Sequence, residues 1–444
     1  MMKAANPADL TLTEGLWALG SRPASDADRQ RAVLHLVDWL GCAVAGAATP
    51  TGRAIAAHSH PFTGSGAAGA IAMGGLGSLF EMDDVHRTAL LHPGPVVLPA
   101  VLALAEHAPD ADLAGAILAG YEAMVRLGAA VGPGHYAFFH NTGTCGGIGA
   151  AAAAAHVLGL TDAQAVSAMG HAVSTAGGFW QCRNEPCATK HLHVADAARR
   201  GVQAALWARA GLVGPRRILE GPQGFFAAVA RDGDPDAVLA GPFTWRIHEV
   251  SFKPWPACRH AHPTIDAALQ LRADLQGRTI AKVRVKTFAD AIVFCDRPDP
   301  KTEAQAKFSL QHSVAVTLLS GPPVLADFAL DCLGDRALAR LRALTEVAAD
   351  PDLTARYPAH FGAIVEVETT DGAQLRAEVA DALGDSENPL DKNAILAKFH
   401  ALTAYAGVHG HQAETLADAA LALADGGSSV PLRAALATLT FPAA

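Results

Sequence analysis

Alternation of apolar and polar residues, the pattern of a half-buried strand, is confined to two parts of this chain. The first covers residues 279–288, and the second covers residues 361–379, on both sides of Asp371-Gly372. An Asp-Gly pair between two alternating runs predicts a β-hairpin. Before residue 220 there is no convincing strand pattern, and beyond residue 388 the apolar residues return to helical spacing. The pattern therefore predicts a mainly helical protein with one smaller α+β part.

Because 444 residues exceed the size at which a single core usually stops growing, we expect two domains. A large all-helical domain formed by both chain ends is predicted over residues 1–265 and 388–444, with an α+β domain inserted over residues 270–385. Residues 63–70 are predicted to form a loop, and the C-terminal tail to pack back on the helical domain. Helical spacing and capping residues predict helices over 8–20, 26–47, 51–60, 95–107, 110–131, 146–158, from Thr161 onward, 303–320, 335–347, 394–399 and 413–423.

The composition limits which kinds of molecule the protein can bind and in which cellular compartment we expect it. Half of the residues are hydrophobic and 17% are charged, which suits a large buried core. A net charge of −9 argues against nucleic acid, because phosphates call for a basic surface. The seven cysteines form no repeated Cys-X-X-Cys pair, which suggests free thiols in a reducing cytosol. The N-terminal residues lack the apolar region of a secretory signal, so we expect a cytoplasmic protein.

Residues 127–160 contain no Asp, Glu, Lys or Arg, and this run is long enough to span a bilayer. The run also contains three histidines, Pro133 and a Gly-rich centre at residues 143–149. These features favour a buried helix preceded by a functional loop. We therefore predict no association with a membrane.

Charged side chains crowd the stretch directly before the apolar run from Val96 to Ala105. Such groups are costly to desolvate unless they pair with one another or with a ligand. A capped helix start with a few surface charges would explain an isolated stretch equally well. Other polar stretches of the chain favour a functional site here. The charged residues are Glu81, Asp83, Asp84, His86, Arg87 and His92.

Four further stretches place polar groups in apolar, Gly-rich or proline-fixed surroundings. They are His140-Asn141-Thr142-Gly143-Thr144 before a helix, Lys190 beside His191 and His193, the run 251–264 with Lys253, Cys258 and Arg259, and the run 307–312, which ends in His312. The first would suit an anion at a helix N-terminus, or it is a plain N-cap. It is neither a dinucleotide fingerprint nor a Walker A motif. The two His-X-His pairs, 191/193 and 260/262, also admit a zinc site, but no His-Glu-X-X-His or cysteine-pair pattern supports one.

The order of five motifs along the chain resembles that of the MmgE/PrpD family. The motifs are EMDD followed by HPG, FHNTG, TKHLH, FKPWPACRHAH and FSLQH. The family includes 2-methylcitrate dehydratase, cis-aconitate decarboxylase and iminodisuccinate epimerase. The resemblance implies a large helical domain with a smaller α+β lid domain. It also implies a homodimer that needs no organic cofactor.

Residue by residue, the resemblance implies a set of site positions and some departures from the family pattern. Expected to act in catalysis are Glu81, Asp84, His92, His140 and Lys190, while substrate binding is expected from Lys253, Arg259, Cys258, Thr142, His312 and His86. Ser78 stands where the family has a histidine, and Glu81 where it has an aspartate. Cys258 replaces a histidine of the decarboxylase branch, and His312 replaces a tyrosine. We expect Glu81, Asp84, His92, His140, Lys190 and Lys253 to converge on one pocket without a metal ion.

The reactions of the family imply removal of a proton from a carbon next to a carboxylate. The base would be His92 or His140, held in its tautomer by Glu81 or Asp84, and cationic groups would stabilise the anionic intermediate. Because the departures fall where the dehydratase and decarboxylase patterns should match, we favour an epimerase of the iminodisuccinate type, acting on a small di- or tricarboxylate. The alternatives are a hydro-lyase of the 2-methylcitrate dehydratase type, a lyase of the cis-aconitate decarboxylase type, and a non-catalytic ligand-binding dimer.

Overall fold

The computed structural model describes residues 10–56, 60–185, 187–275 and 277–441. These residues divide into two compact units. Unit 1 contains the chain up to Leu79, residues 83–250 and the chain from Asp391 onward, whereas unit 2 contains residues 80–82 and 251–390. Both ends of the chain therefore contribute to one unit, into which the other is inserted.

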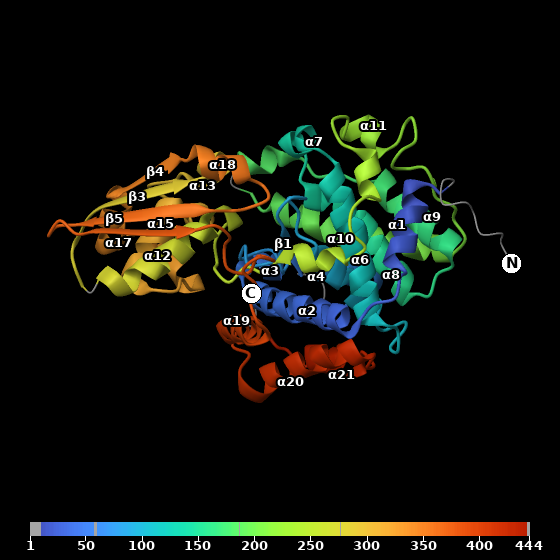
Figure 1. Cartoon of the computed structure of the whole chain (residues 1–444). Helices are drawn as coiled ribbons and strands as arrows, with labels where there is room; N and C mark the ends of the chain where they lie inside the picture. The colour runs from blue at the N-terminus through green and yellow to red at the C-terminus, as the bar shows by residue number, and fades with distance from the viewer. Residues whose placement is uncertain (1–9, 57–59, 186, 276, 442–444) are drawn as a thin grey trace. The chain divides into compact units, whose positions relative to one another are not determined.

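Unit 1 is built from helices, many of which begin at a side chain that caps the free amides of the first turn (Figure 1). In α2, Ser25 and Asp28 form a reciprocal capping box, and Thr11 and Glu14 do the same in α1. The α-helices are α1 (Leu12–Gly20), α2 (Asp26–Ala47), α3 (Pro50–Ile55), α4 (Gly66–Gly74), α5 (Gly94–Leu102), α6 (Leu113–Ala130), α7 (Pro133–Phe138), α8 (Asn141–Val157), α9 (Asp162–Ser174), α10 (Thr189–Arg209), α11 (Phe225–Val229), α19 (Lys392–Tyr405), α20 (Gly410–Leu421) and α21 (Val430–Ala437).

The Ala-rich helix α8 packs against α5, α6, α9 and α10. Small residues allow this close packing: a Cβ atom at Gly201 of α10 would lie 2.3 Å from the Cβ of Ala150 in α8. Helix α6 is long and apolar enough to cross a membrane by length and composition, and 89% of it is buried in the structure. Such burial is usual for a core helix. The C-terminal helices α19 and α20 pack on α2, as expected from the sequence, and bring Lys398 to 2.6 Å from the buried carboxylate of Asp38.

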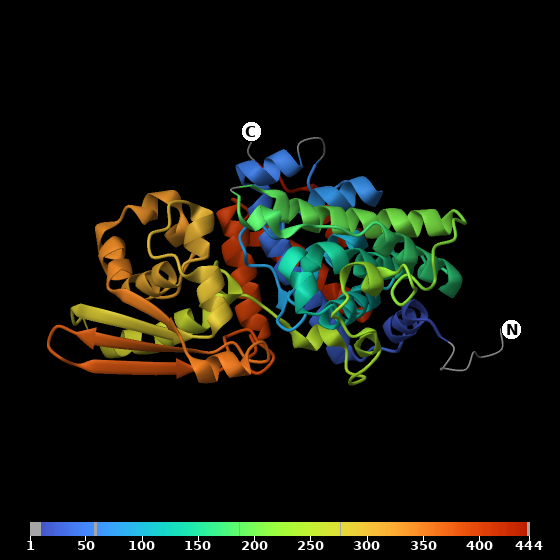
Figure 2. The ribbon, with the colours of Figure 1, turned by 90° about the horizontal axis from the view of Figure 1, so that it is seen from above.

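Unit 2 contains a four-stranded sheet in the order β4-β3-β5-β6, in which only the β3–β4 pair is parallel. The strands are β3 (Ile280–Thr287), β4 (Thr345–Ala349), β5 (Ala363–Thr369) and β6 (Gln374–Val379). Figure 2 shows them in one layer, with helices of the unit in a second layer. Helices α12 and α15 cover the sheet and bury Val283, Val285 and Val365. The helices of unit 2 are α12 (His262–Leu275), α13 (Ala289–Cys295), α14 (Glu303–Lys307), α15 (Leu310–Ser320), α16 (Leu330–Leu333), α17 (Arg336–Ala343) and α18 (Pro351–Arg356).

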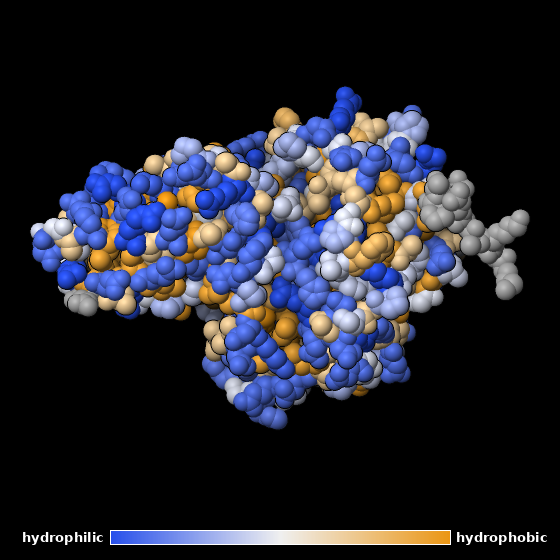
Figure 3. Space-filling view, viewed as in Figure 1, coloured by the Kyte–Doolittle hydropathy of each residue, from blue (hydrophilic) through white to orange (hydrophobic). Residues whose placement is uncertain are grey.

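The alternate residues of these strands are polar and form ion pairs across the sheet. Lys286 lies 3.0 Å from Glu366, and Lys282 lies 2.7 Å from Glu346. In Figure 3 the part of unit 2 that carries the sheet shows such hydrophilic side chains interleaved with apolar ones. Alternation of buried valines with paired charges is therefore the physical origin of the strand pattern in the sequence.

The strand patterns at 279–288 and 361–379 are confirmed by β3, β5 and β6, but other expectations need correction. The predicted helix 335–347 ends at Ala343, and its last residues belong to the short edge strand β4. Helix α4 begins inside the expected loop 63–70, α10 was not anticipated, and the helix expected over 95–107 ends at Leu102. Residues 57–59 of the expected helix 51–60 lie outside the described residues, as do residues 1–9, 186, 276 and 442–444.

Two further corrections concern the boundary between the units and the presence of two very short strands. The segment 251–265, which was expected in the helical domain, belongs to unit 2 because its backbone bonds there: the Phe252 amide donates to the Gly384 carbonyl and the Cys258 amide to the Lys307 carbonyl. Two-residue strands β1 (Val85–His86) and β2 (Val250–Ser251) pair with each other, although no strand was expected before residue 220. Short 3₁₀ helices complete the chain: η2 (Trp180–Arg183), η3 (Pro235–Val238), η4 (Arg246–Glu249), η5 (Arg259–Ala261), η6 (Leu325–Phe328) and η7 (Ala422–Asp425).

Candidate active site

The carboxylate of Asp84 is a buried anchor in unit 1. Its Oδ2 accepts hydrogen bonds from Nδ1 of His35 at 2.7 Å and from the Tyr121 hydroxyl at 2.6 Å. Its Oδ1 accepts from the Gly94 amide at 2.8 Å. Burial lowers the pKa of His35 to about 4, so this imidazole is neutral at pH 7 and donates its Nδ1 proton. Asp84 was expected from the sequence to act in catalysis, whereas its three partners favour a structural role.

The imidazole of His92 is held through one of its two nitrogens. Its Nδ1 lies 2.8 Å from the Asp84 carbonyl oxygen and 3.0 Å from Oδ2 of Asp83, so Nδ1 carries a proton that these oxygens accept. The His92 amide donates to Oγ1 of Thr142 at 3.1 Å, which also fixes the backbone. Nε2 is therefore the nitrogen that His92 can offer for proton transfer, and 15% of the side chain is exposed.

His140 is a buried imidazole directly before α8. Its ring centroid lies 4.4 Å from that of Trp180 and 5.6 Å from that of His193. Within the described part of the chain, its Nδ1 has no hydrogen-bond partner. Burial lowers the pKa of His140 far below its usual value, and the nearby charges of Lys190 and His92 lower it further. The ring is therefore neutral at pH 7.

Lys190 lies in the first turn of α10 and is half-buried. Its positive charge is one of the causes that lower the pKa of His140. The adjacent His191 is held by Ser78, whose Oγ lies 2.8 Å from Nδ1 of the imidazole. In unit 1 the structure thus places Thr142 and Asp83 in contact with His92, while the convergence of His140 and Lys190 on the same pocket stays a prediction.

His86 does not join this group, although it was expected to bind substrate. Its Nε2 lies 3.2 Å from Glu249, and its Nδ1 accepts a hydrogen bond from the Ala89 amide at 3.1 Å. Burial lowers the pKa of His86, which is 3% exposed. Both nitrogens therefore serve to hold the loop between Asp84 and His92.

In unit 2, the buried side chain of Lys253 holds Glu81. Its Nζ donates to the Glu81 carbonyl at 3.1 Å and lies 3.9 Å from Oε2 of the same residue. Glu81 has a φ of +57°, a conformation uncommon for residues other than glycine. Lys307 adds a cation–π contact, with its Nζ 4.6 Å from the ring centre of Phe80. Held backbone strain of this kind is frequent at functional sites.

Arg259 and His312, which were expected to bind substrate, are bound within unit 2. The guanidinium of Arg259 pairs with Asp385 and donates to the Leu383 carbonyl at 3.0 Å. Nε2 of His312 lies 2.9 Å from the Asp327 carbonyl oxygen, and its Nδ1 lies 3.3 Å from Arg342. These partners favour structural roles. Cys258, also in unit 2, has its Sγ 3.3 Å from Nδ1 of His260.

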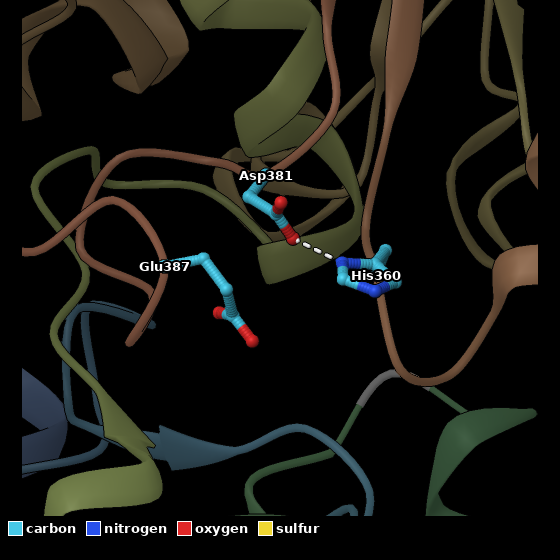
Figure 4. A group of neighbouring side chains, drawn as sticks. All are labelled: His360, Asp381 and Glu387. Carbon is cyan, nitrogen blue, oxygen red and sulfur yellow. Dashed lines mark hydrogen bonds and ion pairs between the residues drawn. The ribbon is translucent and has the colours of Figure 1, made fainter.

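One group of the described residues could hold a metal ion. The donor atoms of His360, Asp381 and Glu387 in unit 2 lie within 4.8 Å of one another, and Nδ1 of His360 is 2.8 Å from Oδ1 of Asp381 (Figure 4). His360 and Glu387 are exposed, and such exposed groups are common without an ion. The His-X-His pairs have other partners, since His191 contacts Ser78 and His260 contacts Cys258.

Comparison with known proteins assigns most of the chain to one family. The MmgE/PrpD N-terminal domain matches residues 17–237, and the MmgE/PrpD C-terminal domain matches residues 255–423. Human cis-aconitate decarboxylase is 30% identical over 345 residues, which cover 72% of this chain and 69% of that protein. Cis-aconitate decarboxylase of Aspergillus terreus is 24% identical over 417 residues, which cover 84% of each chain. The 2-methylcitrate dehydratase of Escherichia coli K12 is 27% identical over 247 residues, 53% of this chain and 51% of the dehydratase.

These relatives are a decarboxylase and a dehydratase, so they support the lyase alternatives better than the epimerase that the sequence analysis favoured. The two domain matches include every motif on which the resemblance was based except Lys253 and its immediate neighbours. They follow one another in the same order as the motifs. This chain therefore belongs to the MmgE/PrpD family.

Proposed function

We propose that this protein is a lyase that releases CO₂ from a small tricarboxylate of the cis-aconitate type. The observation that carries the proposal is the imidazole of His92, which Asp83 and the Asp84 carbonyl hold through Nδ1, and in the proposed site it acts together with His140 and Lys190. Similarity to cis-aconitate decarboxylases over 72% to 84% of the chain supports this choice of reaction.

Decarboxylation leaves an electron pair on the carbon skeleton, and this carbon must then take a proton. In our proposal, Nε2 of His92 donates that proton. Asp83 and the Asp84 carbonyl hold Nδ1–H, so the ring keeps one orientation and transfers the proton through Nε2. A positioned acid or base of this type contributes roughly a hundredfold or more to a rate.

The remaining groups of unit 1 are suited to an anionic substrate. The ammonium of Lys190 supplies a positive charge, and the N-terminus of α8 adds the partial positive charge of a helix end. His140 is neutral because it is buried beside cations, so it can donate or accept a hydrogen bond to a carboxylate without adding charge. This charge distribution favours a substrate with several carboxylates.

Dehydration of a 2-methylcitrate-like substrate is the second candidate, because the bacterial dehydratases match about half of this chain. It would use the same imidazole as a base that removes a proton next to a carboxylate, with an acid for the leaving hydroxyl. That Glu81 and Lys253 serve the same reaction stays a prediction. A Lys253→Met variant with unchanged kcat and KM would contradict it.

The test is incubation in D₂O with cis-aconitate, citrate, 2-methylcitrate and iminodisuccinate, followed by NMR. Decarboxylation is expected to give CO₂ and a product with one carbon-bound deuterium. A new alkene without CO₂ would replace the proposal by dehydration, and inverted configuration without either would replace it by epimerisation. His92→Gln should lower kcat roughly a hundredfold or more. The matched control is His411→Asn, since His411 is exposed on α20 and should not affect activity.

A further inference from the structure

Unit 2 contains two buried cysteines in one apolar cluster, and one of them contacts a histidine. Cys258 precedes the 3₁₀ helix η5, and Cys295 is the last residue of α13, which packs on η5. Nδ1 of His260 lies 3.3 Å from the Cys258 sulfur, and the packing of α13 on η5 brings Cys295 into the same buried cluster as Cys258. Both cysteines are free thiols in the same apolar cluster.

Burial would normally keep thiols such as these protonated and inert. The contacts of Cys258 act in the opposite direction, because the Cys295 thiol and His260 lower its pKa well below the usual value. The pKa of Cys295 is raised well above the usual value by burial and by its neighbour. One sulfur of the pair is thus prepared as a nucleophile, while the other keeps its proton.

His260 has the surroundings of a residue that serves this sulfur. Its ring stacks on Phe294 at 4.9 Å, and rings of Phe288 and Phe361 lie 5.5 and 5.4 Å away. It is 8% exposed, and within the described residues its Nε2 has no hydrogen-bond partner. The imidazole is thus enclosed by aromatic rings, and its Nδ1 interacts with the Cys258 thiol.

We propose that Cys258 and Cys295 are an oxidisable pair, in which a hydroperoxide converts Cys258 to a sulfenic acid and Cys295 then closes a disulfide. In the first step, the Cys258 thiolate attacks the peroxide, the S–O bond forms and the O–O bond breaks, and water or an alcohol leaves with a proton. In the second step, the Cys295 sulfur attacks Cys258, the S–S bond forms and the S–O bond breaks, and the hydroxide leaves as water with the Cys295 proton. Two thiols lose two electrons, and the peroxide is reduced.

This modification site does not depend on the proposed lyase reaction. Cys258 is 7% exposed, so a small peroxide is the class of oxidant that fits, and Cys295 is fully buried. Burial raises the pKa values of the other buried cysteines, Cys42 and Cys145, and Cys145 contacts a threonine hydroxyl rather than an imidazole, so both are expected to stay reduced. The disulfide would fix η5 to the end of α13.

The test treats the full chain with hydrogen peroxide, blocks the remaining thiols with iodoacetamide and identifies linked peptides by mass spectrometry. We expect a link between Cys258 and Cys295 that dithiothreitol reverses. It should form at peroxide doses at which Cys145 still reacts with iodoacetamide once the protein is unfolded. Cys295→Ser should stop at a Cys258 sulfenic acid that dimedone traps. His260→Phe, whose ring suits the aromatic surroundings, should slow oxidation of Cys258 at least tenfold.

The matched control is Cys332→Ser. This substitution removes a thiol of the same unit, one that donates a hydrogen bond to the Ala326 carbonyl. The link between Cys258 and Cys295 should then form as in the unaltered protein. A fully alkylatable Cys258 after peroxide treatment of the unaltered protein would overturn the proposal. So would oxidation of Cys258 at an unchanged rate in a folded His260→Phe variant. The circular dichroism spectrum and melting temperature of each variant show whether it is folded before its chemistry is compared.

Discussion

Two adjacent carboxylates, Asp83 and Asp84, provide the sharpest test of the candidate site. Asp84 accepts three hydrogen bonds, whereas Asp83 faces Nδ1 of His92. Asp84→Asn should therefore lower stability, and Asp83→Asn should lower activity. The two substitutions are matched in size, charge and position along the chain.

The expected magnitude follows from the partners of Asp84. An asparagine has one acceptor oxygen, so at least one of the donors from His35, Tyr121 or Gly94 would face an amide NH₂ group. Loss of one hydrogen bond to a buried charge costs about 1.5–3 kcal/mol, and the stranded donor adds about 1–3 kcal/mol. The free energy of unfolding of unit 1 should fall by about 3–5 kcal/mol, as when one partner of a buried ionic network is removed. For a unit of this size, that corresponds to a Tm lower by roughly 5 to 8 °C.

In Asp83→Asn, the amide oxygen can still accept the Nδ1 proton of His92, so the fold should change little. The negative charge beside the His92 ring is lost, and kcat should fall roughly a hundredfold. Calorimetry gives Tm, and the pH dependence of kcat/KM on the substrate identified by NMR gives the effect on His92. The reasoning would be refuted if Asp84→Asn melted with the unaltered protein while Asp83→Asn lost several degrees and kept its activity.

Three other predictions concern single groups. His140→Phe, which removes the hydrogen bond to the substrate carboxylate but keeps an aromatic ring, should lower kcat/KM roughly tenfold or more, and unchanged kinetics would remove His140 from the reaction. Burial lowers the pKa of His35 to about 4, from about 6.5 in the unfolded chain, so the unfolded state binds more protons between these two pH values. The free energy of unfolding should therefore fall by up to about 3 kcal/mol as the pH drops from about 6.5 to about 4. His35→Asn, which keeps a donor for Asp84, should weaken the fall in Tm between pH 7 and pH 5. Treatment with EDTA followed by desalting should leave activity intact, and recovery only with added zinc would give the group at His360 a functional role.

The sequence predicted the elements whose burial alternates or repeats clearly. The valines of β3 and β5 face the core while lysines and glutamates between them face one another, and this gives a period of two. Strand β4 was missed because it is a five-residue edge strand that ends in two alanines. Helix α10 was missed because its first turn is polar, and because its contact with α8 uses Gly201 and alanines rather than a stripe of large apolar residues.

For the site, the sequence identified His92 and His140 because imidazoles stand out in apolar surroundings, but it did not separate the roles of Asp83 and Asp84. That separation depends on His35 and Tyr121, which lie 49 and 37 positions from Asp84 in the chain. Both appear in the sequence as ordinary members of long helices. Their polar atoms reach Asp84 only when α2 and α6 are packed on the loop that contains it.

The pairing of Asp83 with His92 and of Asp84 with the helices has a common physical basis. The Asp84 carboxylate bonds to His35 of α2 and Tyr121 of α6, whereas the Asp83 carboxylate lies 3.0 Å from Nδ1 of His92. If Asp84 were not anchored, its carbonyl oxygen, which lies 2.8 Å from Nδ1 of His92, would not be fixed either. The anchor therefore positions the imidazole through the backbone, while Asp83 supplies the charge. In Asp84→Asn the remaining hydrogen bonds still hold this backbone while the protein is folded, so activity should fall in proportion to the unfolded fraction and recover on cooling. The loss in Asp83→Asn should persist at every temperature at which the protein is folded.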